Sequence, residues 1–186
     1  VACNGTSTGS VTVAGAGGTS PYQYSLNGGT YQASGTFGTL IAGAYTVTVK
    51  DINGCTIPVA VTITQPATPV SGSITSQTNV SCFGGNNGSV TVAGAGGTSP
   101  YMYSLNGGIF QASGIFGTLI AGPFTVTVRD ANLCTKDVAV TITQPATTLS
   151  GIISAQTNVL CRGNNTGSVT VLGAGGTAPY QYSLNG

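Results

Sequence analysis

The feature that most constrains the fold of this chain is a repetition with a period of 79 residues. The stretch GSVTVAGAGGTSPYQYSLNG at residues 9–28 recurs almost unchanged at 88–107 and at 167–186. About three quarters of the first 79 positions are identical to the next 79, without an insertion or a deletion. The cysteines keep the same period, as two series: Cys3, Cys82 and Cys161; Cys55 and Cys134. Solenoid coils are about 20–50 residues long, so this longer period predicts one small domain repeated in tandem.

The repeat boundaries follow from the proline-bearing segments that separate the copies. Pro66 and Pro69 bracket a short, stiff linker, so the physical unit is expected to run from Ala67 to Pro145. We therefore expect residues 1–66 to be a repeat that lacks its first strand, 67–145 a complete repeat, and 146–186 the N-terminal half of a third. Both ends fall inside the unit, which suggests a window cut from a longer array.

The composition excludes several classes of partner. Charged residues make up 4% of the chain, with four Lys and Arg, three Asp, and neither His nor Glu. Nucleic-acid binding and membrane-surface binding both need clustered cations, and the four cations are scattered singly. No apolar run approaches the ~18 residues that span a bilayer. We expect no nucleic-acid partner and no membrane insertion in this segment.

Alternating apolar and polar residues predict strands throughout the repeat. In the first run, Val11 and Val13 share one face. In the second run, Tyr22, Tyr24 and Leu26 share one face, and Gln23 and Ser25 lie on the opposite face. A short returning strand is expected at 30–32, and the strongest strand carries Tyr45, Val47 and Val49 inward. The turns between them are predicted as type I′ hairpins, which need two residues with positive φ: Asn27-Gly28 and Asn106-Gly107. Roughly seven short strands per unit favour an all-β chain of tandem immunoglobulin-like β-sandwich domains.

No catalytic or cofactor site can be assembled from these residues. There is no His to act as a base, and each repeat offers one or two Asp, so neither a nucleophile triad nor a carboxylate pair is available. Asp51-Ile52-Asn53-Gly54 imitates the start of a calcium loop but lacks the further oxygen ligands, so a turn is the better interpretation. We predict a non-enzymatic protein without a cofactor or a metal.

The cysteines predict disulfides and an oxidising compartment, because they are periodic and occur without His or CxxC pairs. In a sandwich, Cys82 and Cys134 would lie at opposite ends of strands about 25 Å long, too far apart for a bond. An inter-domain Cys3–Cys134 bridge is therefore favoured, with the partners of Cys55, Cys82 and Cys161 outside the window. The alternative pairs Cys3 with Cys55 and Cys82 with Cys134, and requires a different topology.

Outward threonines, such as Thr46 and Thr48 or Thr62 and Thr64, allow three interpretations. The ordinary one is a solvated strand face, since Thr has a high strand propensity. The others are a glycan-bearing surface and a flat array that binds ice or a polysaccharide; Asn79-Val80-Ser81 also forms a glycosylation sequon. A neutral surface lacks the charges that deter edge-to-edge association, so lateral or end-to-end self-assembly is expected.

Four spaced motifs resemble the SprB-type repeat of Bacteroidetes cell-surface proteins: Cys82-Phe-Gly-Gly-Asn-Asn-Gly-Ser, GGTSPY at 96–101, AGPFTVTVRDANLC at 121–134 and VTITQP at 140–145. GAYTVTVKD at 43–51 is also similar to PKD and other Ig-like domains. The resemblance implies a very long extracellular adhesin, carried to the cell surface by type IX secretion and in some members serving gliding motility. Leu133 departs from the Asn-Gly-Cys ending that residues 53–55 keep.

Together these features predict a structural segment of an extracellular, surface-attached filament or adhesin stalk that acts mechanically. Its expected partner is itself, with a surface polysaccharide as a further partner. The alternative is a carbohydrate- or ice-binding module that uses the repeated Thr faces.

Overall fold

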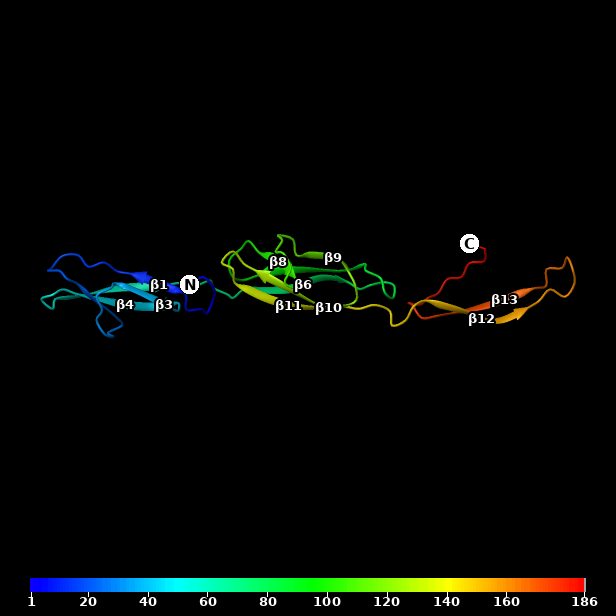
Figure 1. Cartoon of the computed structure of the whole chain (residues 1–186), viewed down its shortest axis with the longest axis horizontal. Helices are drawn as coiled ribbons and strands as arrows, with labels where there is room; N and C mark the ends of the chain where they lie inside the picture. Colours follow the sequence, from blue (N-terminus) through cyan, green and yellow to red (C-terminus); the bar gives the residue numbers. More distant parts are fainter. Residues whose placement is uncertain (186) are drawn as a thin grey trace.

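The computed structural model describes residues 1–185, whose regular elements are the strands β1 to β13. The predicted all-β class and the tandem β-sandwich architecture are confirmed. Three successive units lie in a row along the longest axis of the molecule, joined by short linkers (Figure 1). We call them the first unit (residues 1–66), the middle unit (67–145) and the third unit (146–186).

The middle unit is a sandwich of two three-stranded antiparallel sheets. One sheet has the order β6-β7-β9 and the other β11-β10-β8. Its strands are β6 (Ser71–Thr78), β7 (Gly88–Ala95), β8 (Met102–Leu105), β9 (Ile115–Leu119), β10 (Gly122–Arg129) and β11 (Thr135–Ile142). The core between the sheets is built from the alternating valines, including Val90, Val92, Val126, Val128 and Val140.

The first unit repeats this plan without a counterpart of β6. Its strands are β1 (Gly9–Thr12), β2 (Gln23–Leu26), β3 (Thr36–Leu40), β4 (Gly43–Lys50) and β5 (Thr56–Ile63). They form the sheets β1-β3 and β2-β4-β5. The buried core cluster is correspondingly smaller, with Tyr24, Val47 and Val49 at its centre.

The third unit consists of one hairpin, β12 (Ser150–Thr157) with β13 (Ser168–Ala174). No second sheet packs against it within the described residues, so its apolar side chains face solvent. Val169 and Val171 are 47% and 40% exposed, whereas Val90 and Val92, 79 residues earlier, are 1% and 2% exposed.

The structure departs from the sequence expectations in two details near the Asn-Gly turns. The middle unit has six strands rather than about seven, because the expected returning segment is reduced to an isolated bridge, Tyr103↔Gln111, as it is at Tyr24↔Gln32 in the first unit. Ser25 was expected on the outward face but is buried. The segment after the turn folds back over it, and Ser25 Oγ donates a hydrogen bond to the Gly29 carbonyl at 2.7 Å.

The turn residues singled out in the sequence all have positive φ. The φ values are 46° and 74° at Asn27 and Gly28, and 48° and 74° at Asn106 and Gly107. Each turn closes with a bond from the following glycine amide, Gly29 to the Leu26 carbonyl and Gly108 to the Leu105 carbonyl. The Asn27 side chain also accepts the Thr46 amide at 2.8 Å, which ties the turn to β4.

Candidate functional site at the junctions between repeats

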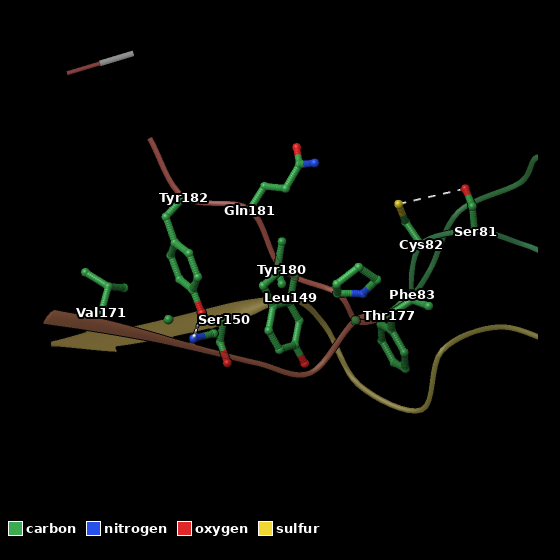
Figure 2. Close-up of a pocket in the computed structure, with 14 residues that line it drawn as sticks. Ser81, Cys82, Phe83, Leu149, Ser150, Val171, Thr177, Tyr180, Gln181 and Tyr182 are labelled. Atoms are coloured by element: carbon green, nitrogen blue, oxygen red, sulfur yellow. Dashed lines mark hydrogen bonds between the residues drawn. The ribbon is translucent and has the colours of Figure 1, made fainter. Parts of the chain in front are cut away.

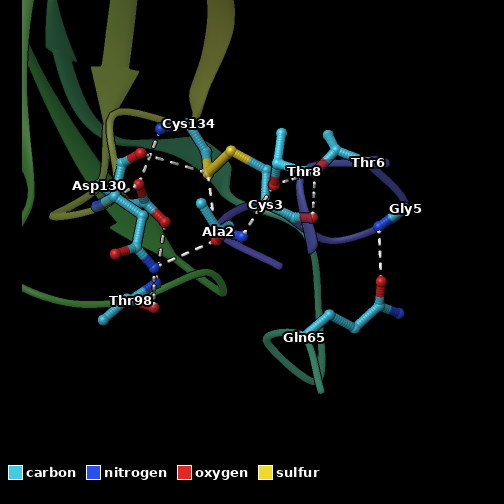
Figure 3. Close-up of a disulfide and its surroundings, with 10 residues drawn as sticks. Ala2, Cys3, Gly5, Thr6, Thr8, Gln65, Thr98, Asp130 and Cys134 are labelled. Carbon is cyan, nitrogen blue, oxygen red and sulfur yellow. Dashed lines mark hydrogen bonds between the residues drawn. A yellow bond between two sulfur atoms is a disulfide. The ribbon is translucent and has the colours of Figure 1, made fainter. Parts of the chain in front are cut away.

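Cys3 and Cys134 join the first unit to the middle unit through a disulfide, with the two Cα atoms 5.7 Å apart (Figure 3). Cys3 lies in the loop before β1, and Cys134 directly precedes β11. The intra-unit pairs, Cys3 with Cys55 and Cys82 with Cys134, are not formed in this structure. For the protein in solution, the Cys3–Cys134 pairing is a prediction. Peptide mapping under non-reducing conditions is expected to recover the Cys3 peptide joined to the Cys134 peptide.

The other three cysteines, Cys55, Cys82 and Cys161, are free and exposed. The Cys82 sulfur accepts a hydrogen bond from the Ser81 hydroxyl at 3.9 Å. It lies beside a hollow at the junction of the middle and third units, together with Phe83, Leu149 and Tyr180 (Figure 2). This hollow corresponds to the groove beside Cys3 and Cys134 one repeat earlier, which Val70 and Leu133 line. The two junctions are therefore equivalent in position, and only the first is bridged.

A buried carboxylate shapes the loop that carries Cys134. Asp130 is 2% exposed and accepts three backbone N–H groups, from Thr98 at 2.9 Å, Asn132 at 2.9 Å and Cys134 at 2.8 Å. Hydrogen bonds to a charged acceptor are stronger than neutral ones. Asp130 therefore fixes the position from which the Cys134 side chain reaches the first unit.

Polar contacts support the bridge on both sides. Asn132 Nδ2 donates to the Ala2 carbonyl across the junction at 3.1 Å and to the Thr98 hydroxyl at 2.9 Å. The linker is held from the other side, since the Gly5 amide donates to Gln65 Oε1 at 2.8 Å. The Gly84 amide and Gln144 Oε1 repeat that contact at the second junction, also at 2.8 Å. The linkers are thus tied to the loop of the preceding unit rather than free.

Asp51 occupies the same loop position in the first unit as Asp130 does in the middle unit. Its pKa is lowered from the usual 3.8, first by the hydrogen bond from the Cys55 amide and then by that from Thr19, which stabilise the ionised form. A carboxyl with a lowered pKa binds fewer protons when folded than when unfolded, so its stabilisation is present above the unfolded pKa. It is lost as the pH falls through the lower, folded pKa.

We expect the first unit to lose stability below about pH 4, and the variant Asp51→Asn to show a flatter dependence because the titrating group is absent. Thermal melts between pH 2 and pH 6 measure this. Asp137→Asn is the matched control, since Asp137 is exposed and accepts one hydroxyl, from Thr127. A slope that is the same in both variants would show that Asp51 is not responsible.

Leu133 adopts a backbone conformation that favours glycine. Its φ is 66°, and the residue at the same position in the first unit, Gly54, has a φ of 87°. Both amides donate to the carbonyl of the loop aspartate, so the turn is preserved. A left-handed conformation costs an L-residue about 1–2 kcal/mol, and Leu133 is 70% exposed, so little packing offsets that cost.

Leu133→Gly is expected to stabilise the middle unit by about 1 kcal/mol, after the entropy cost of a glycine in the unfolded chain. Urea unfolding followed by circular dichroism measures it. The reciprocal variant Gly54→Leu is expected to destabilise the first unit by a similar amount, because Leu would have to adopt the left-handed φ of Gly54. A Cβ at Gly54 meets no atom within 4 Å, so a steric clash does not add to this cost. If Leu133→Gly were destabilising, Leu133 would instead contribute packing at the groove that it lines.

The outward threonines do not form a continuous array. In the first unit, Thr46 lies opposite Ala60 and Thr48 opposite Pro58 across the β4-β5 ladder. In the middle unit Thr127 lies opposite Asp137 and donates to its carboxylate at 2.7 Å. The tyrosines that share a strand face with Leu26 make internal contacts: Tyr24 is buried and its hydroxyl accepts the Gly15 amide at 2.9 Å, and the Tyr22 hydroxyl donates to the Gly17 carbonyl at 2.6 Å.

The few charged groups also have local roles. The Arg129 guanidinium lies 3.7 Å from the Phe110 ring centre, and the Lys50 ammonium lies 4.0 Å from that of Tyr31. Among residues 1–185, no three side chains of metal-ligating type come together. In the described part of the chain, no helix is long and apolar enough to cross a membrane.

The fold and the bridged junctions define a tandem β-sandwich repeat protein. A family profile described as SprB repeat matches the chain three times, at residues 1–31, 72–110 and 153–186. These matches cover more than half of the chain, and the chain belongs to the SprB repeat family. No curated protein and no solved structure matches it. SprB repeats are structural, non-enzymatic repeats of cell-surface proteins, so this is an adhesin-like, cell-surface type of repeat region.

Proposed function

We propose that this chain is a load-bearing segment of an extracellular filament or adhesin stalk, which serves surface attachment or gliding. In this proposal the protein is exported by type IX secretion in a member of the Bacteroidetes and stays attached to the cell surface. Its principal partner is another copy of itself. A surface polysaccharide is the further partner, bound elsewhere than on the interrupted threonine rows.

The observation that carries this proposal is the disulfide between Cys3 of the first unit and Cys134 of the middle unit. A disulfide within a unit would stabilise that unit alone, whereas this one crosses a junction and opposes the separation of neighbouring units. The hydrogen bond from Asn132 to Ala2 crosses the same junction, and the one from Gly5 to Gln65, within the first unit, anchors the end of that unit where the linker begins. Covalent junctions between units in a row suit a part that transmits tension.

The test is immunogold electron microscopy of the source cells with antibodies raised against this chain. Labelled fibres at the cell surface, with an axial repeat of about 35–45 Å per unit as strand and linker lengths suggest, would support the stalk. Label confined to the cytoplasm would refute it. A glycan array probed with the purified chain separates the alternative, since submicromolar binding to one glycan class would favour a carbohydrate-binding module.

A further inference from the structure

The outer face of the sheet β2-β4-β5 in the first unit carries a row of three polar side chains. Lys50 on β4 is paired with Gln23 on β2 and with Thr56 on β5, so the three lie side by side on adjacent strands. They face away from the core, because their neighbours Tyr24 and Val49 are buried. Adjacent strands are about 4.8 Å apart, so the row is about 10 Å wide. We call these three residues the polar row.

An aromatic ring lies over the centre of the polar row. Tyr31 belongs to the segment that folds back after the Asn27-Gly28 turn, and the Lys50 ammonium lies 4.0 Å from its ring centre. The tyrosine is half-buried. Binding sites for small polar molecules typically combine an aromatic surface with a few hydrogen-bonding groups. The amide, ammonium and hydroxyl groups beside Tyr31 match that composition.

The chain does not use these polar groups for its own hydrogen bonds. Of the eight tyrosines, the other seven each have a hydroxyl bonded to a backbone group. Within residues 1–185, the hydroxyl of Tyr31 has no such partner, and the side chains of Gln23 and Lys50 make no hydrogen bond. By contrast, the Gln32 amide donates to two backbone carbonyls. The free groups are therefore available to a ligand.

The positive charge of Lys50 is not neutralised by the neighbouring carboxylate. Asp51 is buried on the opposite side of the strand end. Its two carboxylate oxygens accept the backbone amides of Thr19 and Cys55, at 3.1 Å and 2.8 Å. A bound carboxylate would give Lys50 a charge-assisted partner. The outer face of the first unit is therefore complementary to an anion.

The middle unit shows which of these groups the fold requires. Its sheet has the same register, with Met102 and Phe110 in place of the glutamine and the tyrosine. Arg129 replaces the lysine, and its guanidinium lies 3.7 Å from the Phe110 ring centre. A cation over an aromatic ring is thus kept in both units although both residues change. The amide and the hydroxyl are dispensable for folding, so folding does not explain their presence in the first unit.

The middle unit is also less suited to an anion. Asp137 lies opposite Thr127 on the outer face of its sheet, whereas the first unit has Pro58 opposite Thr48. The carboxylate of Asp137 would repel a second carboxylate bound nearby. The two units therefore differ in the chemistry that they present on the same face, while they share one fold.

End-to-end stacking of units leaves this face open. The middle unit is bridged to a preceding unit, yet Thr135 is exposed and Arg129 is half-buried. Their counterparts in the first unit, Thr56 and Lys50, have the same degrees of exposure. A preceding unit therefore does not cover the position of the polar row.

We propose that the polar row and Tyr31 bind an acidic polysaccharide. Lys50 pairs with the carboxylate of a uronic-acid residue, and the Gln23 amide and the Tyr31 hydroxyl exchange hydrogen bonds with sugar hydroxyls. This assigns a site and a chemical class to the polysaccharide partner of the proposed function, and it rests on that part of the proposal. The middle unit acts as a spacer between such sites.

The experiment is isothermal titration calorimetry of the purified 186-residue chain. The probes are oligoalginate, which consists of uronic acids, and a neutral cello-oligosaccharide of the same length. Oligoalginate is expected to bind at one site per chain and at least about tenfold more tightly than the neutral probe. Its affinity should fall as salt is added, because the ionic contact is screened. The side-chain amide signal of Gln23 should shift in nuclear magnetic resonance spectra.

One double variant transfers the residues of the middle unit to the first unit. Gln23→Met with Tyr31→Phe is expected to fold normally, because the middle unit folds with these residues. It should weaken oligoalginate binding roughly tenfold or more, since two hydrogen bonds are lost. Thr36→Ile is the matched control: it also introduces the residue of the middle unit, but on the other sheet, and should leave the affinity unchanged.

A second pair of variants tests the charge. Lys50→Gln is expected to remove the preference for oligoalginate over the neutral probe, whereas Lys50→Arg should keep it. An intact Cys3–Cys134 bridge and an unchanged circular dichroism spectrum report folding in every variant.

The proposal is overturned if oligoalginate does not bind or binds no better than the neutral probe. It is also overturned if the double variant binds like the parent, or if Thr36→Ile loses as much affinity. Such results would leave the stalk proposal standing, since that depends on labelled fibres at the surface of the source cells. Conversely, tight oligoalginate binding without such fibres would support the site and refute the stalk.

Discussion

Stretched from its two ends under oxidising conditions, the chain is expected to release none of the length stored in residues 4–133. The tension enters near residue 1, passes through the Cys3–Cys134 bond and leaves through the segment that follows Cys134. The first unit and most of the middle unit lie outside this path. After reduction, those residues become extensible, and the contour length is expected to grow by up to about 450 Å, less the folded span.

Single-molecule force spectroscopy of the chain, tethered by its termini, measures this difference with and without a thiol reductant. Cys134→Ser should extend like the reduced protein under all conditions. Cys161→Ser keeps the bridge and serves as the matched control, so it should extend like the oxidised parent. Equal contour gains for the parent before and after reduction would contradict the load path, and with it the mechanical part of the proposed function.

The same bond has a thermodynamic consequence. It closes a loop with a sequence separation of 131 residues, and the chain-entropy model assigns such a loop about 5 kcal/mol of stabilisation. Two small β-sandwiches with few charges bury limited core, so a contribution of this size is a large share of their stability. The disulfide therefore has two effects. Under tension it transmits the force so that residues 4–133 are not stretched, and without tension it stabilises the first and middle units.

The alternation of apolar and polar residues predicted the strands because it is a local signal. Val47 and Val49 alternate with threonines, and the structure buries the valines and leaves Thr46 exposed. Asn27-Gly28 predicted a turn because both residues tolerate positive φ, which they have. These features depend on neighbours a few residues apart, so one sequence is enough to identify them.

What the sequence could not indicate depends on contacts between distant residues. The sequence predicts a turn at residues 51–54 but not the burial of its aspartate: in the equivalent turn of the middle unit, the Asp130 carboxylate is buried and accepts the Thr98 amide, 32 residues away. Ser25 broke the alternation because the chain after the turn covers it.

A large loss of stability in the middle unit is expected for Asp130→Ala. The substitution removes a buried acceptor of three backbone N–H groups and leaves those of Thr98, Asn132 and Cys134 without it. A hydrogen bond to a charged group contributes about 1.5–3 kcal/mol, and the three are coupled, so a loss of about 3–4 kcal/mol is expected. Hydrogen-exchange mass spectrometry should detect this loss of stability as faster amide exchange in residues 97–103 and 130–136.

Asp137→Ala is the matched control for charge, because Asp137 is exposed and makes one side-chain hydrogen bond, with Thr127. Its expected effect is within about 0.5 kcal/mol. Asp130→Ala should also slow formation of the Cys3–Cys134 bond, since the loop that presents Cys134 loses the carboxylate that orders it. If Asp130→Ala exchanged no faster than Asp137→Ala and formed the bridge at the parent rate, then the carboxylate would not organise the junction. The bridge would in that case depend on the docking of the Ala2–Cys3 loop alone.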